Sequence, residues 1–108
     1  MSHHTEIASL LIDVEAELRR LRQWDAEPPS AAALASTEPF CVDTLSFPQW
    51  LQFVFLPRMH ALIDAAQLPP GRCEITPLAE QYFAGGKLDV TLLLNALDAL
   101  DRRINSIQ

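Results

Sequence analysis

The chain has 108 residues, of which 49% are apolar, and its 14 acidic and 8 basic side chains give a formal charge of −6. This length is sufficient for one domain, residues 1–108, whose core needs no metal or disulfide. The negative charge disfavours direct binding of nucleic acid, because it repels the phosphate backbone. Regularly spaced apolar residues predict an ordered chain except at its ends.

The sequence predicts a cytoplasmic protein that does not associate with membranes. Its apolar runs are much shorter than the roughly 20 residues that a membrane-spanning helix needs. The early acidic residues Glu6 and Asp13 do not fit a secretory signal. Cys41 and Cys73 could form one disulfide, but two free thiols are expected in the cytoplasm.

A first amphipathic helix is predicted from a stripe of apolar residues at alternating steps of four and three. The stripe consists of Ile7, Leu11, Val14, Leu18 and Leu21. Before it, the pair His3 and His4 could suggest a metal site, but no further ligands follow at a useful spacing. We therefore expect a frayed terminus over residues 1–4.

A basic cluster, Arg19, Arg20 and Arg22, ends this helix. It could bind a phosphate or an acidic partner, or it could face the negative end of the helix dipole, which we favour because acidic residues follow. Residues 28–39 then form a predicted loop, with a short helical turn over residues 31–34 capped by Ser30. This loop could pack across the end of the fold or act as a mobile lid.

The central helix has the clearest start signal in the chain. Ser46 and Gln49 form a capping box, so a helix is predicted to begin at Phe47, with Pro48 in its first turn. Residues 50–56 are apolar all round except at Gln52, so this helix is either fully buried or in contact with a partner. Pro57 predicts a kink or a break just before it.

Two further helices are predicted after a turn at residues 68–71. The pair Thr76-Pro77 starts a short helix with Thr76 as its cap, and Gly85 with Gly86 closes it. A last helix, capped by Asp89, carries a second apolar stripe. That stripe consists of Leu93, Leu97, Leu100, Ile104 and Ile107, and Asp98, Asp101, Arg102 and Arg103 are expected outside it.

Together these elements predict an all-α protein: a single-domain, up-and-down-like bundle of four principal helices. The two long helices at the ends of the chain have matching apolar stripes, which favours packing against each other and around the central helix.

The central stretch resembles the signature of the YqcC-like family of small bacterial proteins. The resemblance is carried by Pro39-Phe40, Asp43-Thr44-Leu45, Phe47, residues 49–55 and Pro57-Arg58-Met59, and residues 33–36 and 77–83 fit the same pattern. It implies a compact helical bundle of unassigned activity, in a family often encoded beside a tRNA pseudouridine synthase. It implies no set of catalytic residues.

Few side chains are candidates for chemistry. Cys41 or Cys73 with His60 would be the one thiol and base combination, although nothing in the sequence brings them together. Asp43 could be a general base, but a local turn is favoured, and Arg58 is expected to pair with it rather than with a ligand. No phosphate-binding glycine loop or metal-ligand spacing is present, so we expect no cofactor and no enzyme activity.

We therefore expect an interaction module that binds an unknown protein partner or a second copy of itself. The predicted binding residues are Trp50, Phe53 and Phe40, together with Arg58 and Asp43. The reason is that a small bundle has limited interior in which to bury aromatic residues on every side of one helix.

Two alternatives remain open. The chain could be an accessory factor linked to tRNA modification, as the family resemblance implies. It could also be a small-molecule-binding bundle, in which the break at Pro57 frees the Phe53 carbonyl and Asp43 and Arg58 line a pocket.

Overall fold

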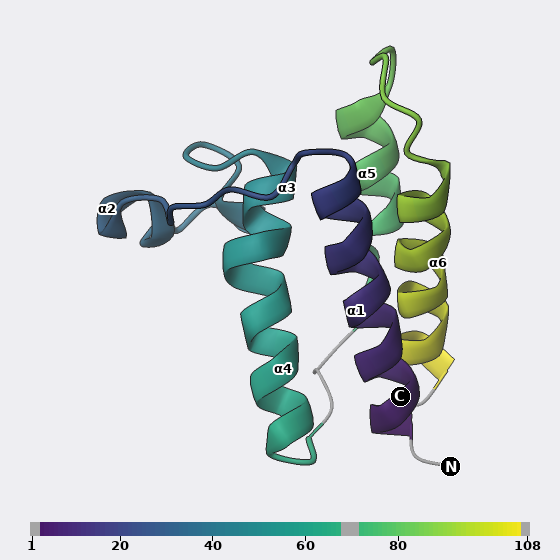
Figure 1. The fold of residues 1–108 in the computed structure, drawn as a ribbon. Coiled ribbons are helices and arrows are strands. Elements are labelled where there is room, and N and C mark those ends of the chain that lie inside the picture. Colours follow the sequence, from purple (N-terminus) through teal and green to yellow (C-terminus); the bar gives the residue numbers. More distant parts are fainter. Residues whose placement is uncertain (1–2, 68–71, 107–108) are drawn as a thin grey trace.

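The computed structural model describes residues 3–67 and 72–106, and these form helices and connecting loops without a strand (Figure 1). The elements are α1 (His3–Arg20), α2 (Ala31–Leu34), the 3₁₀ turn η1 (Pro39–Cys41), α3 (Phe47–Trp50), the π-helical turn η2 (Leu51–Phe55), α4 (Leu56–Asp64), α5 (Thr76–Phe83) and α6 (Thr91–Ser106). The prediction of an all-α fold is confirmed. The predicted turn at residues 68–71 and the last stripe residue, Ile107, lie outside the described residues, as do residues 1 and 2 of the predicted frayed end.

The bundle is built on the two long terminal helices, which lie side by side (Figure 1). Their predicted apolar stripes face each other in the core, with Leu18 on α1 and Leu97 on α6 both fully buried. Helices α3 and α4 form one column with η2 between them, next to α1, and α5 packs on α6. Among the described residues, α1, the column of α3, η2 and α4, α5 and α6 are therefore the four principal helical segments around one core. Each of them buries an apolar side there.

The central helix begins where the sequence predicts. The Ser46 hydroxyl accepts a hydrogen bond from the Gln49 amide at 3.3 Å, and the Gln49 side chain accepts one from the Ser46 amide at 2.9 Å. This capping box satisfies two amides that have no partner inside the helix. Both are local interactions, which is why the sequence reveals them.

The predicted irregularity before Pro57 takes the form of a π-helical turn, and the helix continues through it. The Leu56 amide donates to the carbonyl of Leu51, five residues back. The wider turn leaves room for the proline ring, which would clash with the backbone of a regular α-helix. Figure 1 accordingly shows α3, η2 and α4 as an unbroken column.

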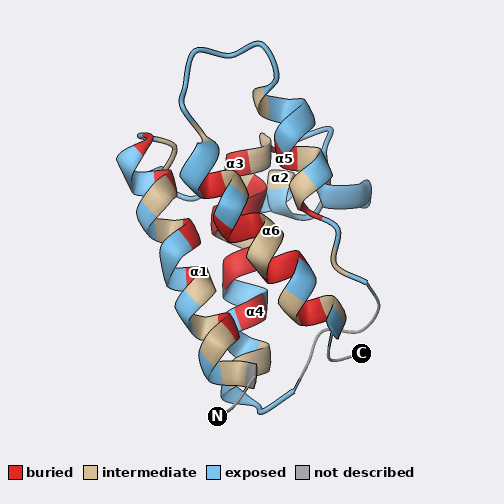
Figure 2. Ribbon diagram, turned by 90° about the vertical axis from the view of Figure 1, so that its right-hand side faces the viewer, coloured by how far each residue is buried: buried red, intermediate tan, exposed pale blue. Residues whose placement is uncertain are grey.

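The segment that carries α2 projects from the bundle (Figure 1). Ser30 caps α2 as predicted, by accepting from the Ala33 amide at 3.1 Å. Helix α2 has no buried residue, and Figure 2 shows most of it in the exposed colour, while the buried residues gather where the other helices face one another. We call residues 30–46 the arm.

The ends of the other helices also follow local signals. Gly85 has a φ of 75°, the left-handed conformation predicted for the end of α5. Before α6, the Asp89 carboxylate accepts from the hydroxyl and the amide of Thr91, which hold the pKa of Asp89 below its usual value. At the other end of the chain, α1 already includes His3 and His4, for which a frayed end was expected, and the His4 ring donates to the Gln67 carbonyl at 3.0 Å.

None of the helices in the part of the chain that the structure describes combines the length and the apolar character needed to cross a membrane.

Candidate partner-binding surface

Six aromatic rings from η1, α3, η2 and α5 contact one another in series. They are Phe40, Trp50, Phe55, Phe47, Tyr82 and Phe83. Trp50 is at the centre: the edge-on ring of Phe40 lies 4.9 Å from it and the ring of Phe55 lies 5.4 Å from it, between centroids. Such contacts add about 0.5–1.5 kcal/mol per pair to the burial of apolar area. The series joins the arm to the body of the bundle.

One side of this cluster is exposed. Phe40 is 42% exposed, Val42 72% and Tyr82 49%, and Phe47 between them is half-buried. We call these four residues the aromatic face. The buried Trp50 contacts the rings of Phe40 and Phe47 from the core side. Exposed apolar side chains that adjoin one another in this way are typical of binding surfaces.

The backbone of the arm is strained where it presents this face. Phe40 has a φ of 57° and Cys41 a φ of 51°, so two consecutive residues with side chains adopt the left-handed conformation. Each such residue costs on the order of 1–3 kcal/mol and persists only when its surroundings hold it. Here the Phe40 ring rests on Trp50 and the Cys41 side chain is buried, so packing stabilises the strained turn.

Two hollows flank the Phe40 ring. The first, the α5 hollow, has a volume of about 320 Å³ and lies between the aromatic face and Leu78 and Gln81 of α5. The second, the Arg58 hollow, has a volume of about 280 Å³ and is lined by Phe40, Trp50 and Arg58 among others. The exposed Phe40 ring therefore separates two places where side chains of a partner could insert.

The five predicted binding residues do not all meet. Phe40, Trp50 and Arg58 line one hollow. Phe53 is only partly buried and its ring contacts no other aromatic ring of the described chain, whereas Phe55 lies against Trp50. The reason is the π turn, in which the residue five positions on, not three, returns to the same side of the helix.

Asp43 holds the arm together and does not join the hollow. Its carboxylate accepts from the Ser36 hydroxyl at 2.5 Å, and the next residue, Thr44, donates its hydroxyl proton to the Ala33 carbonyl at 2.7 Å. The predicted ion pair between Asp43 and Arg58 does not form. The predicted turn at Asp43 does form, closed by the amides of Thr44 and Leu45, which donate to the Cys41 carbonyl at 3.0 and 2.8 Å. The Asp43 carboxylate, however, accepts from the Ser36 hydroxyl and not from local amides.

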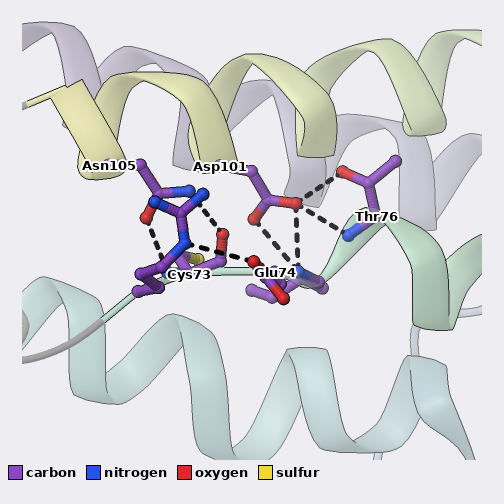
Figure 3. A network of polar contacts seen from close by, with 7 residues as sticks. Cys73, Glu74, Thr76, Asp101 and Asn105 are labelled. Carbon is purple, nitrogen blue, oxygen red and sulfur yellow. Dashed lines mark hydrogen bonds and ion pairs between the residues drawn. The ribbon is translucent and has the colours of Figure 1, made fainter.

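A buried carboxylate on α6 organises the start of α5 (Figure 3). Asp101 accepts from the Ile75 amide at 3.0 Å, the Thr76 amide at 2.9 Å and the Thr76 hydroxyl at 2.8 Å. Asp101 was predicted to lie outside the buried stripe, and this was wrong, since it is 8% exposed. Thr76 was predicted to cap α5 but is its first residue, and Asp101 supplies the cap from another helix.

Two side-chain amides fix loops to helices in the same way. Asn105, beside Asp101 in Figure 3, accepts from the Cys73 amide at 2.8 Å and donates to the Cys73 carbonyl at 2.9 Å. Gln52 does the same with the amide and the carbonyl of Asp25, both at 2.8 Å. The sequence marked Gln52 as the one polar residue of an apolar helix, but it gave no sign of the loop residue that it binds.

Comparison with known proteins identifies the family. Residues 6–103 match the family model described as DUF446: tRNA pseudouridine synthase C. The chain belongs to the DUF446 family. It is 36% identical to the uncharacterized protein YqcC of Escherichia coli over 101 residues, which cover 94% of this chain and 93% of that protein. The predicted resemblance to YqcC is therefore confirmed.

A solved structure supports the fold of this DUF446 chain. The solution NMR structure of YqcC from E. coli superimposes with a TM-score of 0.84 at 35% sequence identity, covering 96% of this chain and 89% of that one. An uncharacterized protein of Haemophilus influenzae is 35% identical over 96 residues, 89% of this chain and 90% of its own length. These homologues have no assigned function.

Another DUF446 relative is much longer. A protein of Pectobacterium carotovorum named tRNA pseudouridine synthase C is 48% identical over 65 residues, which are 60% of this chain but 17% of that protein. This chain thus spans a small part of the Pectobacterium protein, in contrast to its nearly full coverage of the two shorter relatives.

The cysteines of this DUF446 chain do not form the thiol and base combination considered above. Cys41 is buried and Cys73 is half-buried, and both are free thiols. Burial, and after it the neighbouring Asp101, raises the pKa of Cys73 well above its usual range, so its thiol stays protonated and is a poor nucleophile. His60 is exposed on α4, and within residues 3–67 and 72–106 no hydrogen bond joins it to either cysteine.

Proposed function

We propose that this chain is a non-catalytic binding module whose partner is a tRNA pseudouridine synthase, and that the two act together in the cytoplasm. The observation that carries the proposal is the Pectobacterium protein, in which a segment homologous to this chain is part of a longer polypeptide with that name. Two units in one polypeptide meet at an effective concentration on the order of millimolar. Where the synthase is a separate polypeptide, an interface takes the place of this covalent link.

The aromatic face is the surface that suits this interface. Aromatic side chains are the usual anchors of protein interfaces, and here Phe40 and Tyr82 are exposed beside the buried Trp50. Their support is rigid, because ring contacts and a strained turn fix Phe40. A rigid anchor loses little conformational entropy on binding.

The charge of the chain supports a protein partner over direct contact with tRNA. At −6, the chain repels a phosphate backbone. Two of the basic residues at the end of α1 are also neutralised locally, Arg19 by Glu15 at 3.0 Å and Arg20 by Glu17 at 2.8 Å. In this proposal the synthase holds the tRNA and this chain holds the synthase.

The proposal is tested by measuring the binding of this chain to the tRNA pseudouridine synthase of its own host by titration calorimetry. The variant Val42→Ala with Tyr82→Ala removes apolar area from the aromatic face at two exposed positions. A matched control, Ile12→Ala with Leu92→Ala, removes similar area elsewhere, since Ile12 is 64% and Leu92 57% exposed.

We expect the first pair to weaken binding at least tenfold, about 1.4 kcal/mol, and the control pair to leave it within about twofold. No binding of the native chain would contradict the proposal, and so would equal effects of the two pairs. Light scattering on the chain alone tests self-association through the same face, which would appear as a dimer that the first pair dissociates.

A further inference from the structure

Arg58 differs from most arginines of the chain because no acidic residue pairs with it. Five others form ion pairs: Arg19, Arg20, Arg72, Arg102 and Arg103. Arg58 and Arg22 form neither an ion pair nor a hydrogen bond through their side chains with the residues at 3–67 and 72–106. Of these two, Arg58 lines the Arg58 hollow, whereas Arg22 lines neither of the two hollows beside Phe40.

The Arg58 hollow has an apolar floor. Trp50, Phe55 and Met59 are at most 8% exposed, and the buried Ile75 and Ile104 also line the hollow. Its volume of about 280 Å³ is slightly below the range of pockets that enclose drug-sized ligands, roughly 300–1,000 Å³. One large apolar side chain is therefore a better match than a complete organic ligand.

The other charged side chains that line the hollow do not neutralise the positive charge of Arg58. Arg72 and Glu74 also line the hollow, but they neutralise each other at 3.1 Å. A guanidinium group offers two parallel donors that match the two oxygens of a carboxylate. The hollow thus combines an apolar cavity with one free positive charge at its edge.

We propose that the Arg58 hollow is a subsite of the interface with the synthase. It takes an apolar side chain of that enzyme, and Arg58 binds a carboxylate of an Asp or Glu next to that side chain. This inference rests on the proposed function and adds the chemistry that the partner must present. The sequence predicted that Arg58 pairs with Asp43. In this proposal, Arg58 pairs with an acidic residue of the partner instead.

The test compares charge changes at the two unpaired arginines. Arg58→Glu reverses the charge at the hollow, Arg58→Lys keeps the charge but loses the paired donors, and Arg22→Glu is the matched control. Titration calorimetry with the host synthase measures each dissociation constant at about 50 and 300 mM salt, since a charge pair at an interface rim weakens with salt.

We expect Arg58→Glu to weaken binding at least tenfold, Arg58→Lys to weaken it less, and Arg22→Glu to change it by less than about twofold. The native chain should lose more affinity with added salt than the Arg58→Glu variant. If the native chain binds and Arg58→Glu binds equally well, the subsite is wrong while the proposed function stands. If the native chain does not bind the synthase at all, both are overturned.

Discussion

At the scale of single residues, three polar side chains fix the positions of segments that the pattern of apolar residues does not predict. Asp101, Asn105 and Gln52 each bind backbone groups of a segment more than 20 residues away. Asp101 follows the stripe residue Leu100 directly, so a helical projection places it at the edge of the buried stripe. Only the packing of α5 against α6 decides that this edge is covered.

Replacement of Asp101 by Ala should lower the free energy of unfolding by about 2–3 kcal/mol, because it removes the cap of α5 and leaves buried amides unpaired. Urea denaturation measures this. The control is Asp98→Ala on the same helix, where an exposed ion pair with Arg102 is lost, and we expect less than about 1 kcal/mol. Equal losses for the two variants would contradict the role given to Asp101.

The raised pKa of Cys73 predicts that the folded chain loses stability in alkaline solution. Its pKa is raised in the folded chain above the ordinary value of 9.0, so the folded state favours the protonated thiol. The protonated thiol contributes its full stability below pH 9. This stability is lost as the pH rises above 9, because the thiol then ionises more readily in the unfolded chain than in the folded chain. The free energy of unfolding of the native chain, measured between pH 7 and 10.5, should therefore fall more steeply than that of Cys73→Ala. Parallel curves would be inconsistent with a raised pKa.

At the scale of elements, local signals were sufficient for the starts of helices and insufficient for the turn inside the central one. The capping box at Ser46 fixed the start of α3, because both of its bonds lie within four residues. The effect of Pro57 was predicted as a kink or a break, and the structure has a π turn. The sequence named Phe53 with Trp50 and Phe40 as a binding residue, whereas in the structure Phe55 is the phenylalanine of η2 that lies against Trp50.

The π turn predicts which phenylalanine matters for stability. Phe55 is 7% exposed and packs on Trp50, so Phe55→Ala should cost about 3–5 kcal/mol. Phe53→Ala should cost clearly less, since Phe53 lies partly exposed and away from the other rings. Equilibrium denaturation of both variants decides between the π turn and regular α-helical spacing, for which Phe53 would be the costlier loss.

At the scale of the whole molecule, the sequence predicted the fold, but it predicted only part of the proposed binding surface. The two stripes on α1 and α6 predicted that these helices pack together, because only mutual burial satisfies both. The aromatic face combines Phe40 on the arm with Tyr82 on α5, far apart in the sequence, and no local pattern connects them. Their meeting depends on how the arm is held by Asp43, Thr44 and Trp50.

We propose above all that this chain binds a tRNA pseudouridine synthase through the aromatic face. Hydrogen exchange of the chain, with and without a saturating amount of its host's synthase, tests it most directly, because protected amides locate the interface. We predict protection in residues 39–47 and 76–83, and unchanged exchange along the outer sides of α1 and α6. Protection of α1 and α6 alone, or no protection anywhere, would contradict the account.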